Sequence, residues 1–169
     1  GGTLVLDGVT DLTPSAQLLV LHELEQLGAQ NTRLISISDT SILNQVKEDR
    51  FRSDLFHRIS VNQLYVPALR DRPDDIQALA DYFLKISTNA SQYHLGIEAQ
   101  EKLRTFHWPG NVRQLQNIIE QLIIEGPDYL LNGTVVQEVL HKYAQDPSLR
   151  TPEFNNELNE TVAIHVHKY

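Results

Sequence analysis

The hydrophobic pattern of this chain changes its period once, and that change limits the folds available to it. In the first third, short apolar runs at residues 3–6 and 34–38 alternate with segments of helical spacing. Such alternation is typical of buried parallel strands joined by helices. Residues 61–66 are a third candidate strand, and every periodic segment after them has helical spacing. The sequence therefore predicts an α/β fold, in which the end of a parallel sheet is followed by a small helical subdomain.

Local signals give the expected helices their ends. Thr13 is a good capping residue, Pro14 suits a first helical position, and Gly28 ends the same apolar repeat. Asp74 falls in a first turn, where a negative charge favours the helix dipole. A breaker at residues 108–111 precedes a strongly amphipathic segment. The expected helices cover residues 14–27, 41–48, 76–86, 97–106, 112–125 and 134–143.

These signals divide the chain into three parts. Residues 1–72 are expected to form a partial α/β subdomain, and residues 73–144 a helical subdomain. Residues 145–169 are expected to be a polar linker that leads into another helix at residues 158–169. The chain does not start with Met, and both ends interrupt a regular pattern, so we expect a piece of a larger protein.

The composition excludes several classes of function. The 169 residues include 22 acidic and 14 basic side chains, for a net charge of -8. This net negative charge argues against the segment being the main nucleic-acid-binding surface. The absence of cysteine excludes disulfides and cysteine-based zinc sites. No apolar run approaches the roughly 20 residues that span a bilayer, and no signal peptide is recognisable, so we expect a cytoplasmic protein with no membrane partner.

The first seven residues, GGTLVLD, place an aspartate at the carboxyl end of a strand. They resemble the Walker B strand of sigma-54-dependent activators, the NtrC-like bacterial enhancer-binding proteins, whose usual spelling is GGTLFLDE. The resemblance implies an AAA+ domain in which Asp7 helps to hold Mg²⁺ beside the nucleotide phosphates. By itself, however, a buried strand that ends in aspartate fits many unrelated domains, so the later motifs decide.

The residue after Asp7 departs from the family. In sigma-54 activators a glutamate at this place orients the attacking water, whereas this chain has Gly8, which has no side chain. Asp11 is the closest alternative carboxylate, but it comes three residues later, past the expected end of the strand. The resemblance therefore implies that the catalytic position is not intact.

Residues 33–39, RLISISD, resemble the family's sensor I strand, usually RVIAATN. Its Thr-Asn pair reads the γ-phosphate, and the pair here is Ser38 and Asp39. An aspartate would place negative charge close to the phosphates, which should weaken nucleotide binding or γ-phosphate sensing. A structural role for Asp39 as a helix N-cap is an alternative that can hold at the same time.

Residues 50–58, RFRSDLFHR, resemble the family's arginine-finger segment, GRFREDLYYR. Arg52 and Arg58 match its two arginines, which in the family reach into the neighbouring subunit's nucleotide site and offset transition-state charge. Isolated arginines of this kind are ordinary surface ion-pair residues. The surrounding spelling favours the family interpretation.

Two later stretches match the most specific sequence motifs. Residues 64–76, LYVPALRDRPDDI, resemble LPPLRERxxDI, and residues 108–117, WPGNVRQLQN, resemble the sensor II motif WPGNVRELxN. In a competent enzyme of the family, Arg113 would face the nucleotide phosphates. Five motifs in the right order, from residue 1 to about residue 143, make the resemblance strong. Neither a phosphate-binding GxxxxGK loop nor the sigma-contacting GAFTGA loop occurs in the chain.

Three hypotheses about function remain open on the sequence alone. The first is a transcriptional regulator whose AAA+ module has lost hydrolysis and serves self-association, as a dimer or ring, or sensing of a nucleotide or of cyclic di-GMP. The second is an active, ATP- and Mg²⁺-dependent ATPase that remodels the sigma-54 RNA polymerase holoenzyme. Under both, promoter DNA would be bound by a domain outside this chain. The third is an unrelated helical interaction module.

Overall fold

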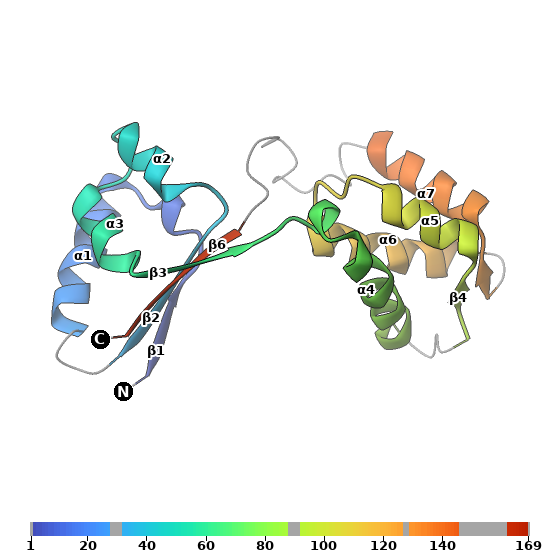
Figure 1. The fold of residues 1–169 in the computed structure, drawn as a ribbon, viewed down its shortest axis with the longest axis horizontal. Coiled ribbons are helices and arrows are strands. Elements are labelled where there is room, and N and C mark those ends of the chain that lie inside the picture. Colours follow the sequence, from blue (N-terminus) through green and yellow to red (C-terminus); the bar gives the residue numbers. More distant parts are fainter. Residues whose placement is uncertain (1, 28–31, 88–91, 127–128, 146–161, 169) are drawn as a thin grey trace. The chain divides into compact units, whose positions relative to one another are not determined.

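Strands and helices alternate over the first part of the chain, as predicted (Figure 1). The computed structural model describes residues 2–27, 32–87, 92–126, 129–145 and 162–168. Contacts divide the chain into two units, Gly1–Pro67 with Leu158–Tyr169, and Ala68–Glu157. The predicted combination of an α/β sheet with a helical subdomain is confirmed. No helix in the described ranges is long and apolar enough to cross a membrane.

The α/β unit is a sheet of four strands in the order β1-β2-β6-β3. The parallel pair β1 and β2 is joined by a helix, as the alternating pattern predicts. Its elements are β1 (Thr3–Leu6), the short 3-10 helix η1 (Val9–Asp11), α1 (Pro14–Leu27), β2 (Arg33–Ser38), α2 (Ile42–Lys47), α3 (Ser53–Ile59), β3 (Asn62–Val66) and β6 (Val162–Lys168).

The predicted helix at residues 158–169 is wrong, because residues Val162–Lys168 form strand β6. β6 runs antiparallel to both β2 and β3 and lies between them (Figure 1). Without it, β2 and β3 would leave a gap one strand wide, with unpaired backbone groups on both sides. The segment is rich in β-branched residues, which suit a strand, and its short apolar run does not distinguish helix from strand. Most of the predicted linker lies outside the described residues.

Helices cover one face of this sheet. Leu34 of β2 packs with Leu24 of α1 and Leu55 of α3 in a core whose buried members are Val9, Leu24, Leu34, Ile42, Phe51, Leu55 and Ile59. The predicted burial of residues 3–6 is wrong, since Leu4 is 37% and Val5 52% exposed. β1 pairs with β2 along one edge, and Val5 lies beside Ile35 on the face away from this core, so little of the strand is covered.

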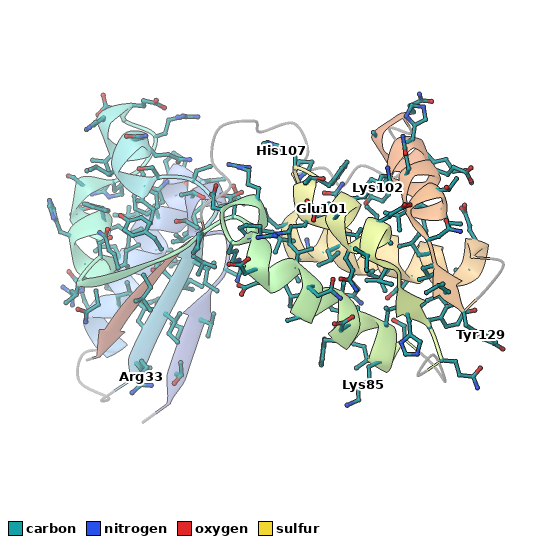
Figure 2. All side chains as sticks on the ribbon, turned by 45° about the vertical axis from the view of Figure 1, so that its right-hand side comes forward. Arg33, Lys85, Glu101, Lys102, His107 and Tyr129 are labelled. Carbon is teal, nitrogen blue, oxygen red and sulfur yellow. The ribbon has the colours of Figure 1, made fainter. Side chains whose placement is uncertain are left out.

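The helical unit has a separate core. Helices α4 (Pro73–Ile86), α5 (Ile97–Thr105), α6 (Asn111–Glu125) and α7 (Gly133–Gln145) follow the 3-10 turn η3 (Leu69–Asp71). Two short strands, β4 (His94–Leu95) and β5 (Leu130–Leu131), form a parallel pair that the sequence pattern did not predict. Lys102 of α5 donates to Gln137 Oε1 of α7 over 2.7 Å, and Figure 2 shows Lys102 between these helices. Trp108 is fully buried at the centre of the unit.

Candidate functional site

The predicted Walker B and sensor I residues come together at one edge of the sheet. β1 and β2 are parallel, and Leu6 pairs with Ser36, so Asp7 follows its strand beside the last residues of β2. Asp7 and Asp39 are both exposed. Thr10 Oγ1 donates to Asp39 Oδ1 over 3.4 Å, which ties the turn after β1 to the end of β2. The carboxyl ends of strands are where open α/β sheets bind ligands.

Gly8 starts a turn that depends on glycine. Its φ of 64° and ψ of 41° lie in the left-handed region, where side chains with a Cβ are strained. A Cβ at this position would lie 3.0 Å from Asp11 Oδ2, closer than ordinary van der Waals contact. The turn is closed by Asp11 N–H, which donates to Gly8 O over 2.9 Å. A carboxylate therefore lies beside residue 8, but it belongs to Asp11 and approaches from outside the strand.

The sensor I pair is divided between interior and surface. Ser38 is fully buried, as is Ser36 two residues earlier, and neither hydroxyl has a hydrogen-bond partner within the described residues. Asp39, by contrast, is exposed. Its alternative role as a helix N-cap is wrong, because Ser41 caps α2 by accepting from Asn44 N–H. Asp39 is thus the accessible member of the pair, and it brings negative charge.

The predicted arginine fingers lie at the N-cap and in the last turn of α3. Arg52 is the N-cap residue, and its Nε and NH2 groups donate to the two carboxylate oxygens of Asp54 over 3.0 and 2.6 Å. This pairing lowers the pKa of the Asp54 carboxyl, and it raises the pKa of Arg52 above its usual value. The Arg52 side chain is still 43% exposed, so it can be reached from outside. Arg58, six residues later, is half-buried.

Gln17 is a site residue that the sequence interpretation missed. It lies on α1 and is 1% exposed, and its side-chain amide donates from Nε2 to Leu12 O over 2.9 Å and to Arg50 O over 3.1 Å. Its Oε1 accepts from Arg52 N–H over 2.9 Å. The available signal was its spacing, since Gln17 precedes Leu21 by four residues and Leu24 by seven. A polar amide on this apolar face of the helix needs buried partners.

Arg113 belongs to the helical unit, where the WPGN segment fixes the start of α6. Trp108 Nε1 donates to Leu103 O over 2.8 Å, and both Trp108 and Asn111 have a φ of 50°. Asn111 Oδ1 accepts from Leu69 N–H over 2.8 Å, and Gln114 Oε1 accepts from Gly110 N–H over 2.9 Å. Arg113 is exposed in the first turn of α6. A cation in a first turn opposes the helix dipole, so helix stability alone does not explain its presence.

The titratable side chains in the segments that follow β1 and β2 are all acidic. Residues 7–12 and 39–41 contain three carboxylates and no Lys or Arg. Oxygen ligands of this kind suit Mg²⁺, whereas phosphates would be repelled. Arg33 lies at the far end of β2, where Figure 2 labels it. No group of three or more His, Cys, Asp or Glu in the described ranges has the geometry of a metal site.

Comparison with known proteins identifies two families along the chain. The sigma-54 interaction domain matches residues 1–65, and the AAA+ ATPase lid domain matches residues 70–153. The chain is 32% identical over 164 residues to the nitrogen fixation protein AnfA of Azotobacter vinelandii, covering 89% of this chain and 29% of AnfA. It is 38% identical over 167 residues to the DNA-binding transcriptional activator HyfR of Escherichia coli, covering 89% of this chain and 25% of HyfR.

Solved structures agree with these matches. NtrX from Brucella abortus in complex with ADP superimposes with a TM-score of 0.71 and 29% identity, over 90% of this chain and 39% of NtrX. The ATP complex of the same protein gives a TM-score of 0.71 and 31% identity, over 85% of this chain and 38% of NtrX. The chain spans between a quarter and two fifths of the length of these relatives.

Proposed function

This chain belongs to the sigma-54 activator family of AAA+ domains, and we propose that it is a regulatory module that serves assembly or ligand sensing without hydrolysing ATP. The turn at Gly8 carries the proposal. Its left-handed backbone and the Asp11 carboxylate 3.0 Å from the site of a Cβ describe a turn built for glycine. Residue 8 therefore has no side chain to orient water, and its left-handed backbone strains any residue that carries a Cβ.

The charge at the strand ends supports the same proposal. Asp7 and Asp39 are exposed acidic side chains at the place where family members meet nucleotide phosphates, and no basic side chain accompanies them in residues 7–12 or 39–41. Asp7 and Asp39 are oxygen donors of the kind that Mg²⁺ prefers, and no chemical step is assigned to ATP here. The groups that in the family act between subunits, Arg52 and Arg58, are retained.

The proposed partners follow from the family. The natural polypeptide would associate with itself, as a dimer or a ring, through the surface that carries Arg52 and Arg58. It would regulate transcription by contacting RNA polymerase that carries sigma-54, and promoter DNA would be bound by a domain outside these residues. The ligand to be sensed would be a nucleotide such as ATP or the second messenger cyclic di-GMP.

A second candidate function, an active ATPase, is favoured by the retention of Asp7, Arg52, Arg58 and Arg113. It requires some carboxylate to orient water, and Asp11 is the nearest to residue 8. Loss of a general base costs about 10²- to 10⁴-fold in rate, so the two candidates differ by a measurable amount. ATP turnover that disappears on Asp7→Ala would favour the ATPase.

Self-association of the natural polypeptide that contains these residues tests the assembly role. We expect Arg52→Ala to weaken association at least about fivefold, because arginine is enriched among the interface residues whose truncation costs more than about 1 kcal/mol. Arg104→Ala is the matched control, since Arg104 is also an exposed arginine paired with an aspartate, Asp74, over 3.1 Å. Sedimentation should be repeated with ATP and with cyclic di-GMP. Equal association of the Arg52 and Arg104 variants would contradict the proposal.

A further inference from the structure

We propose that Gln17 is the positioning residue for Arg52, and that it couples Arg52 to the turn that begins at Gly8. Three backbone segments meet at its side-chain amide: the end of the Gly8 turn at Leu12, the carbonyl of Arg50 and the N–H of Arg52. The consequence for assembly rests on the function proposed above. The positioning of Arg52 does not depend on that function.

The hydrogen bonds of Gln17 imitate those of a neighbouring strand. Its Nε2 donates to the carbonyl of Arg50 and its Oε1 accepts the N–H of Arg52, so one side chain takes both backbone groups that flank Phe51. Phe51 is itself 3% exposed and packed in the core. Held on both sides of a buried ring, the backbone of Arg52 has little freedom to shift. The guanidinium is then fixed by Asp54, two residues along.

The remaining hydrogen bond of Gln17 reaches the candidate site. Nε2 also donates to the carbonyl of Leu12, the C-cap residue of η1, which begins at Gly8 and is closed by the bond from Asp11 N–H to Gly8 O. Thr10 in the same turn contacts Asp39. A displacement of this turn would move the Leu12 carbonyl and with it the side chain of Gln17. The hydrogen bond from Arg52 N–H to Gln17 would then change as well. The carboxyl ends of β1 and β2 are thus connected to Arg52 through one buried amide.

The chemistry of the three bonds explains why the residue is glutamine. Methionine would fill a similar volume but would leave two part-buried carbonyls and one N–H without their bonds to residue 17. Glutamate would keep the acceptor for Arg52 N–H, but it would place a carboxylate within hydrogen-bond distance of the Leu12 and Arg50 carbonyls. The two variants therefore separate the bond to Arg52 from the link to the turn.

Amide hydrogen exchange at Arg52, followed by NMR on the full chain, tests the positioning role. We expect Gln17→Met to speed exchange at Arg52 by about tenfold or more, the factor for losing a bond worth about 1.4 kcal/mol. Gln17→Glu keeps the acceptor for Arg52 N–H and should restore part of the protection, since its second oxygen is repelled by the Leu12 and Arg50 carbonyls. The matched control is Gln26→Met, an exposed glutamine on the same helix, which should leave Arg52 unchanged. Equal exchange in the Gln17→Met and Gln26→Met chains would overturn the proposal.

A double variant tests the coupling. Gly8→Ala strains the turn, because a Cβ there meets Asp11, and it should shift the Arg52 amide resonance in a chain with Gln17. The shift should vanish when Gly8→Ala is combined with Gln17→Glu, which lacks the donor to Leu12 and does not depend on Gln17→Met folding. A shift of equal size in both backgrounds would overturn the coupling. Self-association is measured separately, so an Arg52 amide that responds while association stays constant would contradict only the proposed function.

Discussion

The interiors of the two units of this chain differ in composition. Among the described residues, the helical unit buries eighteen hydrophobic side chains in one core, whereas the α/β unit buries seven and leaves Val5 and Leu64 exposed on its sheet. The α/β unit also contains the long-range amide bonds of Gln17 and two buried serine hydroxyls without described partners. The helical unit therefore has the larger apolar core, while four of the five buried polar residues among those described belong to the α/β unit.

The largest effect is expected in the helical unit. Trp108→Ala removes a fully buried ring and its hydrogen bond to Leu103 O, and should lower the free energy of unfolding by about 3–5 kcal/mol. The change is measured by circular dichroism during urea unfolding. Tryptophan fluorescence cannot be used, because the variant lacks the only tryptophan of the chain. Ile124→Ala, at a side chain 81% exposed on α6, is the control and should cost less than about 0.5 kcal/mol. A loss below about 1 kcal/mol for Trp108→Ala would remove the contrast between the units.

A smaller effect is expected from the core of the α/β unit. Leu55→Ala deletes a side chain that is 0% exposed on α3, and should cost about 2–3 kcal/mol. The lower part of the usual range applies because a sheet covered by helices on one face can relax into the cavity. The exposed Leu19, 62% accessible on α1, is the control for a leucine-to-alanine change. A cost equal to that of Trp108→Ala would show that the two cores are equally rigid.

The sequence pattern predicted elements whose signals are local. The ends of α1 and α4 follow from Pro14, Pro73 and the acidic first turn of α4, and the break before α6 follows from the segment at Trp108. These features depend on the conformational limits of a few neighbouring residues. The predicted site positions Asp7, Gly8, Ser38 and Asp39 lie at adjacent strand ends, because β1 and β2 form a parallel pair.

Other features depend on contacts that are distant in sequence. The tail at residues 162–168 pairs with β2 and β3, which lie far away in the sequence, and its local pattern fits both a helix and a strand. β1 is exposed because its burial depends on what covers the sheet, and periodicity reports only that the strand is apolar. The hydrogen-bond partners of Gln17 lie up to 35 residues away in the sequence. Its helical spacing therefore indicates that the amide is buried, but it does not identify these partners.

The two buried serines provide a test of whether their unit tolerates unpaired polar groups. Ser36→Ala and Ser38→Ala each remove a hydroxyl with no described partner, and each should change the free energy of unfolding by less than about 0.5 kcal/mol or stabilise the fold by up to about 1 kcal/mol. The exposed Ser15→Ala on α1 is the control. Destabilisation above about 1.5 kcal/mol would mean that the hydroxyls are hydrogen-bonded in solution.

The smallest effect is expected from Asp54. Its pKa is lowered in the folded chain by the hydrogen bonds from Arg52, so its contribution to stability is present above the unfolded pKa and is lost as pH falls through the folded pKa. Asp54→Asn should therefore flatten the acid side of the stability profile slightly and leave neutral pH almost unchanged, because the pair is solvent-exposed. Thermal unfolding between pH 2 and pH 7 would reveal this, and a large loss at pH 7 would contradict it.

The central claim is that the Gly8 turn supports assembly without hydrolysis, and ATP turnover by the natural polypeptide that contains these residues tests it most directly. Wild-type protein should turn over ATP no faster than the Asp7→Ala variant. The Gly8→Glu substitution should be made together with Asp11→Ala, so that the Asp11 carboxylate no longer meets the new side chain. Wild-type turnover at least about 10²-fold above that of the Asp7→Ala variant would contradict the claim. A rate of that size would mean that a catalytic base acts at the site, since a base contributes about 10²- to 10⁴-fold.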